Sequence, residues 1–121
     1  METFTYKNYN NCYFVVSSYA INNEAMAISI ESAGEPITTC TIYDDFGIYS
    51  DNITTIKNYS ENSHITDFLK TLGVVTEIIN RYPCNRFVYD TLEGNNPQTI
   101  DTCIINIDKL KKYCKEWHYN V

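Results

Sequence analysis

The chain has 121 residues, of which 44% are hydrophobic and 14% aromatic, and its formal net charge is −6. This composition excludes a disordered chain, and the length is enough for one domain whose core needs no metal or disulfide. We predict a single domain over residues 1–121. Because the apolar runs are too short to cross a membrane and the N-terminus lacks a secretory signal, we expect a cytoplasmic protein that does not bind membranes.

The negative charge is concentrated in the N-terminal half. Residues 1–56 contain seven acidic residues and one basic residue, whereas residues 57–121 contain eight of each. An acidic half repels nucleic acid and speeds association with basic partners. The sequence therefore predicts a basic protein partner and no direct binding to nucleic acid.

The first half of the chain predicts β-structure. Residues 11–19 have the β-branched and aromatic content of a strand. Residues 24–32 and 37–43 alternate apolar and polar side chains on either side of Gly34 and Pro36, which predicts a β-hairpin. The side chains expected to face the core are Met26, Ile28, Ile30, Cys40 and Ile42. Those expected on the outer face are Glu31, Thr39, Thr41 and Tyr43.

Two helices are predicted in the second half of the chain. The first covers residues 63–72, where apolar side chains recur at helical spacing, with Ser63 as N-cap and Gly73 as the C-terminal stop. The second covers residues 108–118, with Asp108 as N-cap. Its expected buried stripe is Leu110, Cys114 and Trp117.

The remaining segments predict further strands. Residues 48–59 form either a short strand or an extended loop, and residues 74–79 form a strand or the entry to a loop. Residues 86–92 and 100–107 are expected strands, separated by a loop over residues 93–98. This order predicts an α+β fold with a mainly antiparallel sheet of about 4–6 strands and both helices packed on one face.

Candidate metal ligands and nucleophiles are scattered. The five cysteines are odd in number and widely spaced, so we expect reduced thiols. Cys114 and His118 would share one face of the second helix, but a structural zinc needs about four ligands in paired clusters. A cysteine nucleophile would need His64 or His118 beside it, and the spacing does not show such a pair. We predict no catalytic residue, no metal site and no cofactor.

Paired carboxylates are present at residues 42–52, which read IYDDFGIYSDN. Acid–base or Mg²⁺ chemistry is conceivable for Asp44 with Asp45 or Asp51, but neither a basic residue nor a glycine-rich loop is present to hold a phosphate. A turn solvated by aspartates is the simpler interpretation. The alternative is a surface that binds a basic cleft, because carboxylates pair with arginine and tyrosine adds contact area at low entropic cost.

Three segments resemble an uncharacterised small domain family of phages, plasmids and conjugative elements. They are EAMAISIESAGEPITTCTIY, ITDFLKTLG and INIDKLKKY, and the resemblance covers roughly residues 24–112 except for residues 80–99. Some proteins of this kind inhibit bacterial defence systems, including CRISPR nucleases. The resemblance implies the cytoplasm of a bacterial host cell as the setting, and it supplies no catalytic residues.

These observations predict a non-enzymatic protein of a phage or mobile element. It would bind and inhibit a host nucleic-acid-processing defence protein, for example a CRISPR effector nuclease, by blocking its basic nucleic-acid-binding cleft. The expected partner-binding residues are Glu31, Glu35, Tyr43, Asp44, Asp45, Phe46, Tyr49 and Asp51. The alternatives are a small cysteine- and histidine-dependent or metal-binding enzyme, and a structural accessory protein of the mobile element.

Overall fold

A computed structural model describes residues 1–84 and 97–121 of the chain. Its elements are β1 (Phe4–Tyr6), β2 (Tyr9–Tyr19), β3 (Asn22–Ser32), β4 (Glu35–Thr39), β5 (Ile53–Asn58), the 3-10 helix η1 (Ser60–Asn62), α1 (Ile65–Thr71), β6 (Val75–Pro83), β7 (Thr99–Ile105), α3 (Ile107–Lys112) and β8 (Cys114–Trp117). The strand expected over residues 86–92 and most of the following loop lie outside the described residues.

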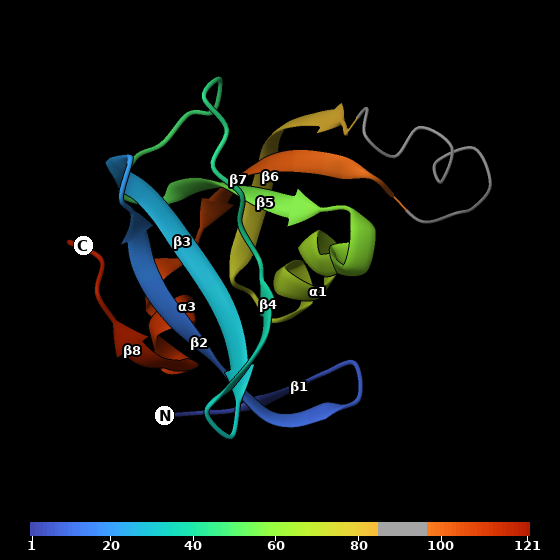
Figure 1. The fold of residues 1–121 in the computed structure, drawn as a ribbon, viewed down its shortest axis with the longest axis vertical. Helices are drawn as coiled ribbons and strands as arrows, with labels where there is room; N and C mark the ends of the chain where they lie inside the picture. The colour runs from blue at the N-terminus through green and yellow to red at the C-terminus, as the bar shows by residue number, and fades with distance from the viewer. Residues whose placement is uncertain (85–96) are drawn as a thin grey trace.

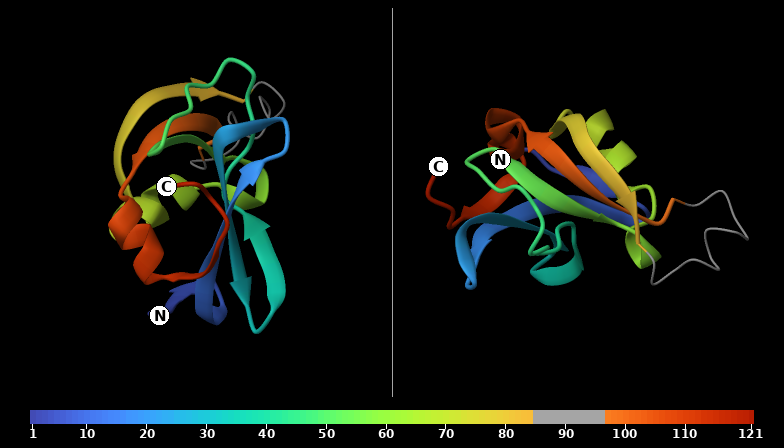
Figure 2. Two further views of the ribbon diagram at one scale, coloured as in Figure 1. Left: turned by 90° about the vertical axis from the view of Figure 1, so that its left-hand side faces the viewer. Right: turned by 90° about the horizontal axis from the view of Figure 1, so that it is seen from above.

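The strands form two sheets (Figure 1). In the first, β1, β2, β3 and β4 pair in this order and antiparallel, and β8 adds a parallel strand to β2. In the second, β7 lies between β5 and β6, antiparallel to both. Figure 2 shows the two sheets facing each other across the core. Within the described residues the fold is therefore mainly antiparallel with two α-helices, as predicted, but the strands are divided between two sheets of five and three instead of one sheet of about 4–6.

The expected hairpin is confirmed, and its turn has the expected chemistry. Residues Ala33 and Gly34 connect β3 to β4, with φ angles of 53° and 79°. Glycine adopts this left-handed region without a steric penalty. Residues 48–59 contain the strand β5. The strand β6 continues through Pro83, and proline is tolerated there because β6 is an edge strand.

The two sheets are joined where the chain leaves β4. The Cys40 amide donates to the Ile28 carbonyl on β3, and the Lys57 amide on β5 donates to the Cys40 carbonyl, both at 2.8 Å. Thr41 then bridges to Ile56. This crossing breaks the predicted alternation, because Thr41 is buried while Ile42 is half-buried. The expectation of an outward Thr41 was wrong.

Apolar side chains from both sheets and both helices fill one core. Met26, Ile28, Ile30 and Cys40 are fully buried, as the hairpin pattern predicts. Leu69 of α1 and Leu110 of α3 are buried in the same cluster. Packing of both helices on one face stays a prediction. Among the described residues, no helix is long and apolar enough to cross a membrane.

The first helix begins later than predicted. Its N-cap is His64, which adopts a left-handed conformation, and not Ser63. The Ser63 hydroxyl instead donates to the Pro97 carbonyl at 2.7 Å, because η1 turns the chain before the helix starts. The C-terminal stop is confirmed: Gly73 has a φ of +81° and its amide donates to the Lys70 carbonyl.

The prediction of a second helix over residues 108–118 was wrong in its length and cap. The helix α3 ends at Lys112, and the side chain that accepts from the Lys109 amide at 3.1 Å belongs to Asn106, not Asp108. The chain then extends as β8 and pairs with β2 beyond the short strand β1. Residues 114–117 therefore form a strand despite their helical periodicity, because they pair with the distant strand β2. Cys114 therefore lies in a strand and shares no helical face with His118.

Candidate binding surface

Residues 42–52 form an ordered connection between β4 and β5, which we name the apical loop (Figure 1). It lies at the same end of the molecule as the turn between β2 and β3. A ring contact joins the two segments, with 5.7 Å between the Tyr19 and Tyr43 centroids. Tyr43 in turn stacks on Tyr49 at 5.2 Å. The three rings form a continuous aromatic cluster that connects the apical loop to the end of β2.

The Tyr49 hydroxyl fixes the shape of the apical loop. It accepts the Asp44 amide at 2.7 Å and lies 2.9 Å from the Thr55 hydroxyl of β5. The Thr55 hydroxyl donates in turn to the Ile42 carbonyl. These bonds tie both ends of the loop to the second sheet. Gly47 packs so closely that a Cβ atom there would lie 2.9 Å from the Tyr49 ring.

Asp44 forms a tight turn at the tip of the loop. Its carboxylate accepts the Phe46 amide at 3.1 Å, and its carbonyl accepts the Gly47 amide at 2.8 Å. This arrangement is an Asx-turn, in which an aspartate side chain replaces a backbone acceptor. For Asp44 the simpler interpretation of a turn aspartate therefore accounts for its carboxylate.

The turn holds apolar side chains out into solvent. Phe46 is 95% exposed and Ile48 is 60% exposed. Ile21, in the neighbouring turn between β2 and β3, is 75% exposed. Asp45 and Asp51 are also exposed, on either side of Phe46 in sequence. Exposed apolar side chains grouped at one end of a protein and rimmed by polar groups mark interaction surfaces.

The structure separates two of the predicted partner-binding residues from the other six. Glu31 and Glu35 flank the turn between β3 and β4, whereas the apical loop follows the opposite end of β4. Glu31 lies across from Tyr13, whose hydroxyl donates to its carboxylate at 3.4 Å. Tyr43, Asp44, Asp45, Phe46, Tyr49 and Asp51 remain together in the apical loop. The predicted continuous edge along the hairpin is therefore divided.

Glu24 of β3 lies beside the apical loop, and the sequence did not predict it as a binding residue. Glu24 and Asp51 line one open hollow of about 320 Å³ together with Tyr49. The hydroxyl of Tyr119, from the C-terminal segment, donates to the Glu24 carbonyl at 2.6 Å. Burial and the two nearby carboxylates raise the pKa of Tyr119. Antiparallel pairing places the start of β3 at this end, which is the signal that could have identified Glu24.

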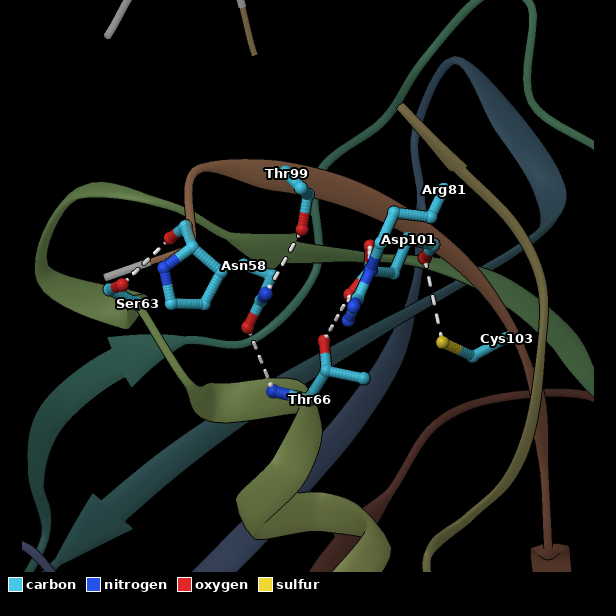
Figure 3. Close-up of polar contacts among 8 residues, drawn as sticks. Asn58, Ser63, Thr66, Arg81, Thr99, Asp101 and Cys103 are labelled. Carbon is cyan, nitrogen blue, oxygen red and sulfur yellow. Dashed lines mark hydrogen bonds and ion pairs between the residues drawn. The ribbon is translucent and has the colours of Figure 1, made fainter. Parts of the chain in front are cut away.

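A second polar cluster lies inside the molecule (Figure 3). Asp101 of β7 is fully buried, and its carboxylate accepts hydrogen bonds from Nε and Nη2 of Arg81, each at 2.8 Å. The Thr66 hydroxyl of α1 donates to the same carboxylate at 2.7 Å. The bond to Asp101 raises the pKa of Arg81. We name Asp101, Arg81 and Thr66 the buried aspartate cluster.

The contacts of the buried aspartate cluster are structural. Asn58 extends it, because its side chain accepts the Thr66 amide and donates to the Thr99 hydroxyl, each at 3.0 Å (Figure 3). The bonds connect β5, β7, β6 and α1. A buried carboxylate with bidentate arginine and hydroxyl donors has its charge compensated. The sequence placed Asp101 in a strand but gave no sign of its burial or partner.

Burial raises the pKa of four cysteine thiols, those of Cys12, Cys40, Cys103 and Cys114. All five cysteines are unpaired. Burial raises the pKa of Cys103 to about 12 and raises the pKa of Cys40 as well. The Cys114 thiol donates to the Glu116 carbonyl at 2.9 Å. A nucleophilic cysteine is favoured by a lowered pKa, and these four thiols are shifted in the opposite direction.

The described residues contain no group of three or more histidine, cysteine, aspartate or glutamate side chains that could hold a metal. His118 lies 3.9 Å from Glu116, and these two are exposed.

Comparison of the chain with protein-family models, curated proteins and solved structures found no match. The arrangement of the surface is therefore the basis for assigning a function.

Proposed function

We propose that this chain is a non-enzymatic binding protein that inserts its apical loop into a basic cleft of a partner protein. The observation that carries the proposal is Phe46, which is 95% exposed on a loop whose conformation hydrogen bonds fix. An exposed aromatic side chain that needs no reordering can bind a pocket at low entropic cost. Such side chains are frequent energetic hot spots.

The charge around Phe46 indicates the chemistry of the partner. The exposed carboxylates of Asp45 and Asp51 flank it, and Glu24 lies across the adjacent hollow. Residues 8–56 contain no lysine or arginine. A surface with one sign of charge favours a partner of the opposite sign and increases the rate of encounter. We therefore infer a cleft rich in arginine and lysine, as in proteins that hold nucleic acid.

The most concrete partner is a bacterial nucleic-acid-processing defence protein. Blocking the nucleic-acid cleft of a CRISPR effector nuclease would require an acidic protein with a protruding anchor, and the apical loop supplies both. The expected setting in a phage or mobile element supports this choice. The protein would act as an inhibitor by occupying the cleft, without performing chemistry of its own.

The test uses a panel of purified bacterial RNA-guided nucleases. We expect the intact chain to inhibit DNA cleavage by at least one of them and to bind it directly. Phe46→Ala should weaken binding by about 30-fold, the effect of a hot-spot residue. Asp45→Lys combined with Asp51→Lys should weaken binding strongly at low salt and less at high salt.

Matched controls lie on the second sheet. Ile79→Ala removes an apolar side chain that is 40% exposed, and Glu77→Lys reverses an exposed acidic residue, both on β6. These variants should bind as the unmodified chain does. Equal losses from the β6 and loop variants would contradict the apical loop as the interface. Absence of binding to every nuclease tested would contradict the choice of partner.

A further inference from the structure

A separate hollow of about 190 Å³ lies between the turn joining β1 to β2, strand β4 and η1. It shares no residue with the apical loop. Its lining includes Tyr6, Lys7, Tyr9, Ile37, Glu61 and Asn62. The hollow thus combines two aromatic rings, an aliphatic side chain and an ammonium group.

Tyr6 contributes an unused hydroxyl to this hollow. The side chain is only 4% exposed, and its ring is held edge-on to Phe68 with the centroids 5.0 Å apart. Within the part of the chain that the structure describes, the hydroxyl has no hydrogen-bond partner, although it is not sealed from solvent. Burial raises the pKa of Tyr6 to about 12, so the phenol remains a neutral donor. Buried tyrosine hydroxyls usually have a partner.

Lys7 contributes positive charge beside the Tyr6 ring. It adopts a left-handed conformation, with φ of 52°, in the turn after β1. Its ammonium lies 5.4 Å from the Tyr6 ring centroid and donates one bond, at 2.6 Å, to the Glu61 backbone carbonyl. An ammonium has three donor hydrogens, so others remain for a ligand.

The only described acidic residue lining the hollow already has a partner. The Glu61 carboxylate pairs with the Lys57 ammonium at 2.7 Å, and hydrogen bonding to Lys57 lowers the pKa of Glu61 to about 2. Two ammonium groups and one carboxylate therefore leave a positive balance around the hollow. The Tyr6 hydroxyl and the remaining Lys7 hydrogens are therefore available to donate to a ligand.

We propose that this hollow binds a small carboxylate. One carboxylate oxygen accepts the Tyr6 hydroxyl, and the Lys7 ammonium compensates the charge. The short apolar part of the ligand contacts Ile37 and the ring of Tyr9, which is 47% exposed. The volume holds roughly six non-hydrogen atoms if each occupies about the 30 Å³ of a water molecule. Propionate and butyrate have this size, as does the side chain of a glutamate.

The test is a titration of the ¹⁵N-labelled full chain with propionate at constant ionic strength, followed by NMR. We expect saturable shifts confined to the amides of Lys7, Ile37 and Asn62. Lys7→Met should abolish the response, and Tyr6→Phe should weaken it about tenfold, since it removes a hydrogen bond to a charged group. Tyr6→Phe should leave the free energy of unfolding unchanged, because no described protein group loses a partner.

Three controls make the result decisive. Lys112→Met removes an exposed lysine elsewhere and should leave propionate binding unchanged. Propionamide, which has the same shape without the charge, should bind at least tenfold more weakly. A glutamate-containing peptide that binds more tightly than propionate would identify a protein as the source of the carboxylate. Equal responses to propionate and propionamide, or a response that never saturates, would overturn the proposal.

Binding in this hollow is independent of the apical loop. Phe46→Ala should leave the propionate titration unchanged, and Lys7→Met should leave inhibition of a nuclease unchanged. Failure of one proposal therefore does not imply failure of the other.

Discussion

The apical loop and the buried aspartate cluster each depend on an aspartate, but the two carboxylates have different roles. Asp44 is half-buried and its carboxylate accepts one backbone amide, whereas Asp101 is fully buried and accepts a guanidinium and a hydroxyl. The first shapes a turn that presents Phe46 to solvent, and the second connects the strands β6 and β7 to the helix α1. The position of a carboxylate relative to the core thus decides whether its charge serves binding or stability.

The largest expected effect separates the two regions by stability. Asp101→Ala removes the acceptor of Arg81 and Thr66 and should lower the free energy of unfolding by about 3 kcal/mol. Asp45→Ala, at an exposed position, should change it by less than about 0.5 kcal/mol. Urea unfolding monitored by circular dichroism measures both. Equal effects would show that Asp101 contributes no more than a surface residue.

Alkaline pH should lower the free energy of unfolding through a group in the core and not through the apical loop. Burial raises the pKa of Cys103 from 9.0 to about 12, so the unfolded chain releases this proton at a lower pH than the folded chain. The resulting stabilisation is fully present below pH 9 and is lost as pH rises toward 12, at up to about 1.4 kcal/mol per pH unit. Urea unfolding at a series of pH values tests this, and Cys103→Ala should flatten the slope. An unchanged slope would assign the loss to other groups.

Tyr49→Phe should have an intermediate effect, confined to the apical loop. The change removes the acceptor of the Asp44 amide and one of the two hydrogen bonds of the Thr55 hydroxyl, which still donates to the Ile42 carbonyl, and should cost about 1–2 kcal/mol. Hydrogen exchange should increase at the Asp44 amide and stay constant at the Thr66 amide of the buried aspartate cluster. Faster exchange at both positions would mean that the two regions unfold together.

The sequence was informative where local pattern and final environment agree. The hairpin of β3 and β4, the stop at Gly73 and the α+β class follow from alternation, turn residues and helical spacing. Residues 113–118 were predicted wrongly, because their helical periodicity did not reveal the open edge of β2. Strand pairing between distant segments is set by the whole fold and has no local signal.

The same limit applies to the candidate surface. Six of its predicted residues are neighbours in sequence and lie together, but Glu31 and Glu35 were grouped with them without knowledge of where the strands end. Glu24 was missed for the same reason. The pairing of Arg81 with Asp101 depends on the register of β6 against β7, in which these two residues are direct partners. Composition alone does not specify that register.

The smallest expected effect on stability is the one that carries the proposed function. Phe46→Ala removes a side chain that is 95% exposed, so the free energy of unfolding should change by less than about 0.5 kcal/mol. If the apical loop is a binding surface, the same change weakens partner binding by about 30-fold. Phe46 would then contribute to binding and not to folding. Asp101 shows the opposite behaviour, because its replacement lowers the free energy of unfolding and leaves the apical loop unchanged. Urea unfolding and partner titration of both variants measure this contrast. A lower free energy of unfolding for Phe46→Ala would show that the Phe46 ring stabilises the fold and is not reserved for binding.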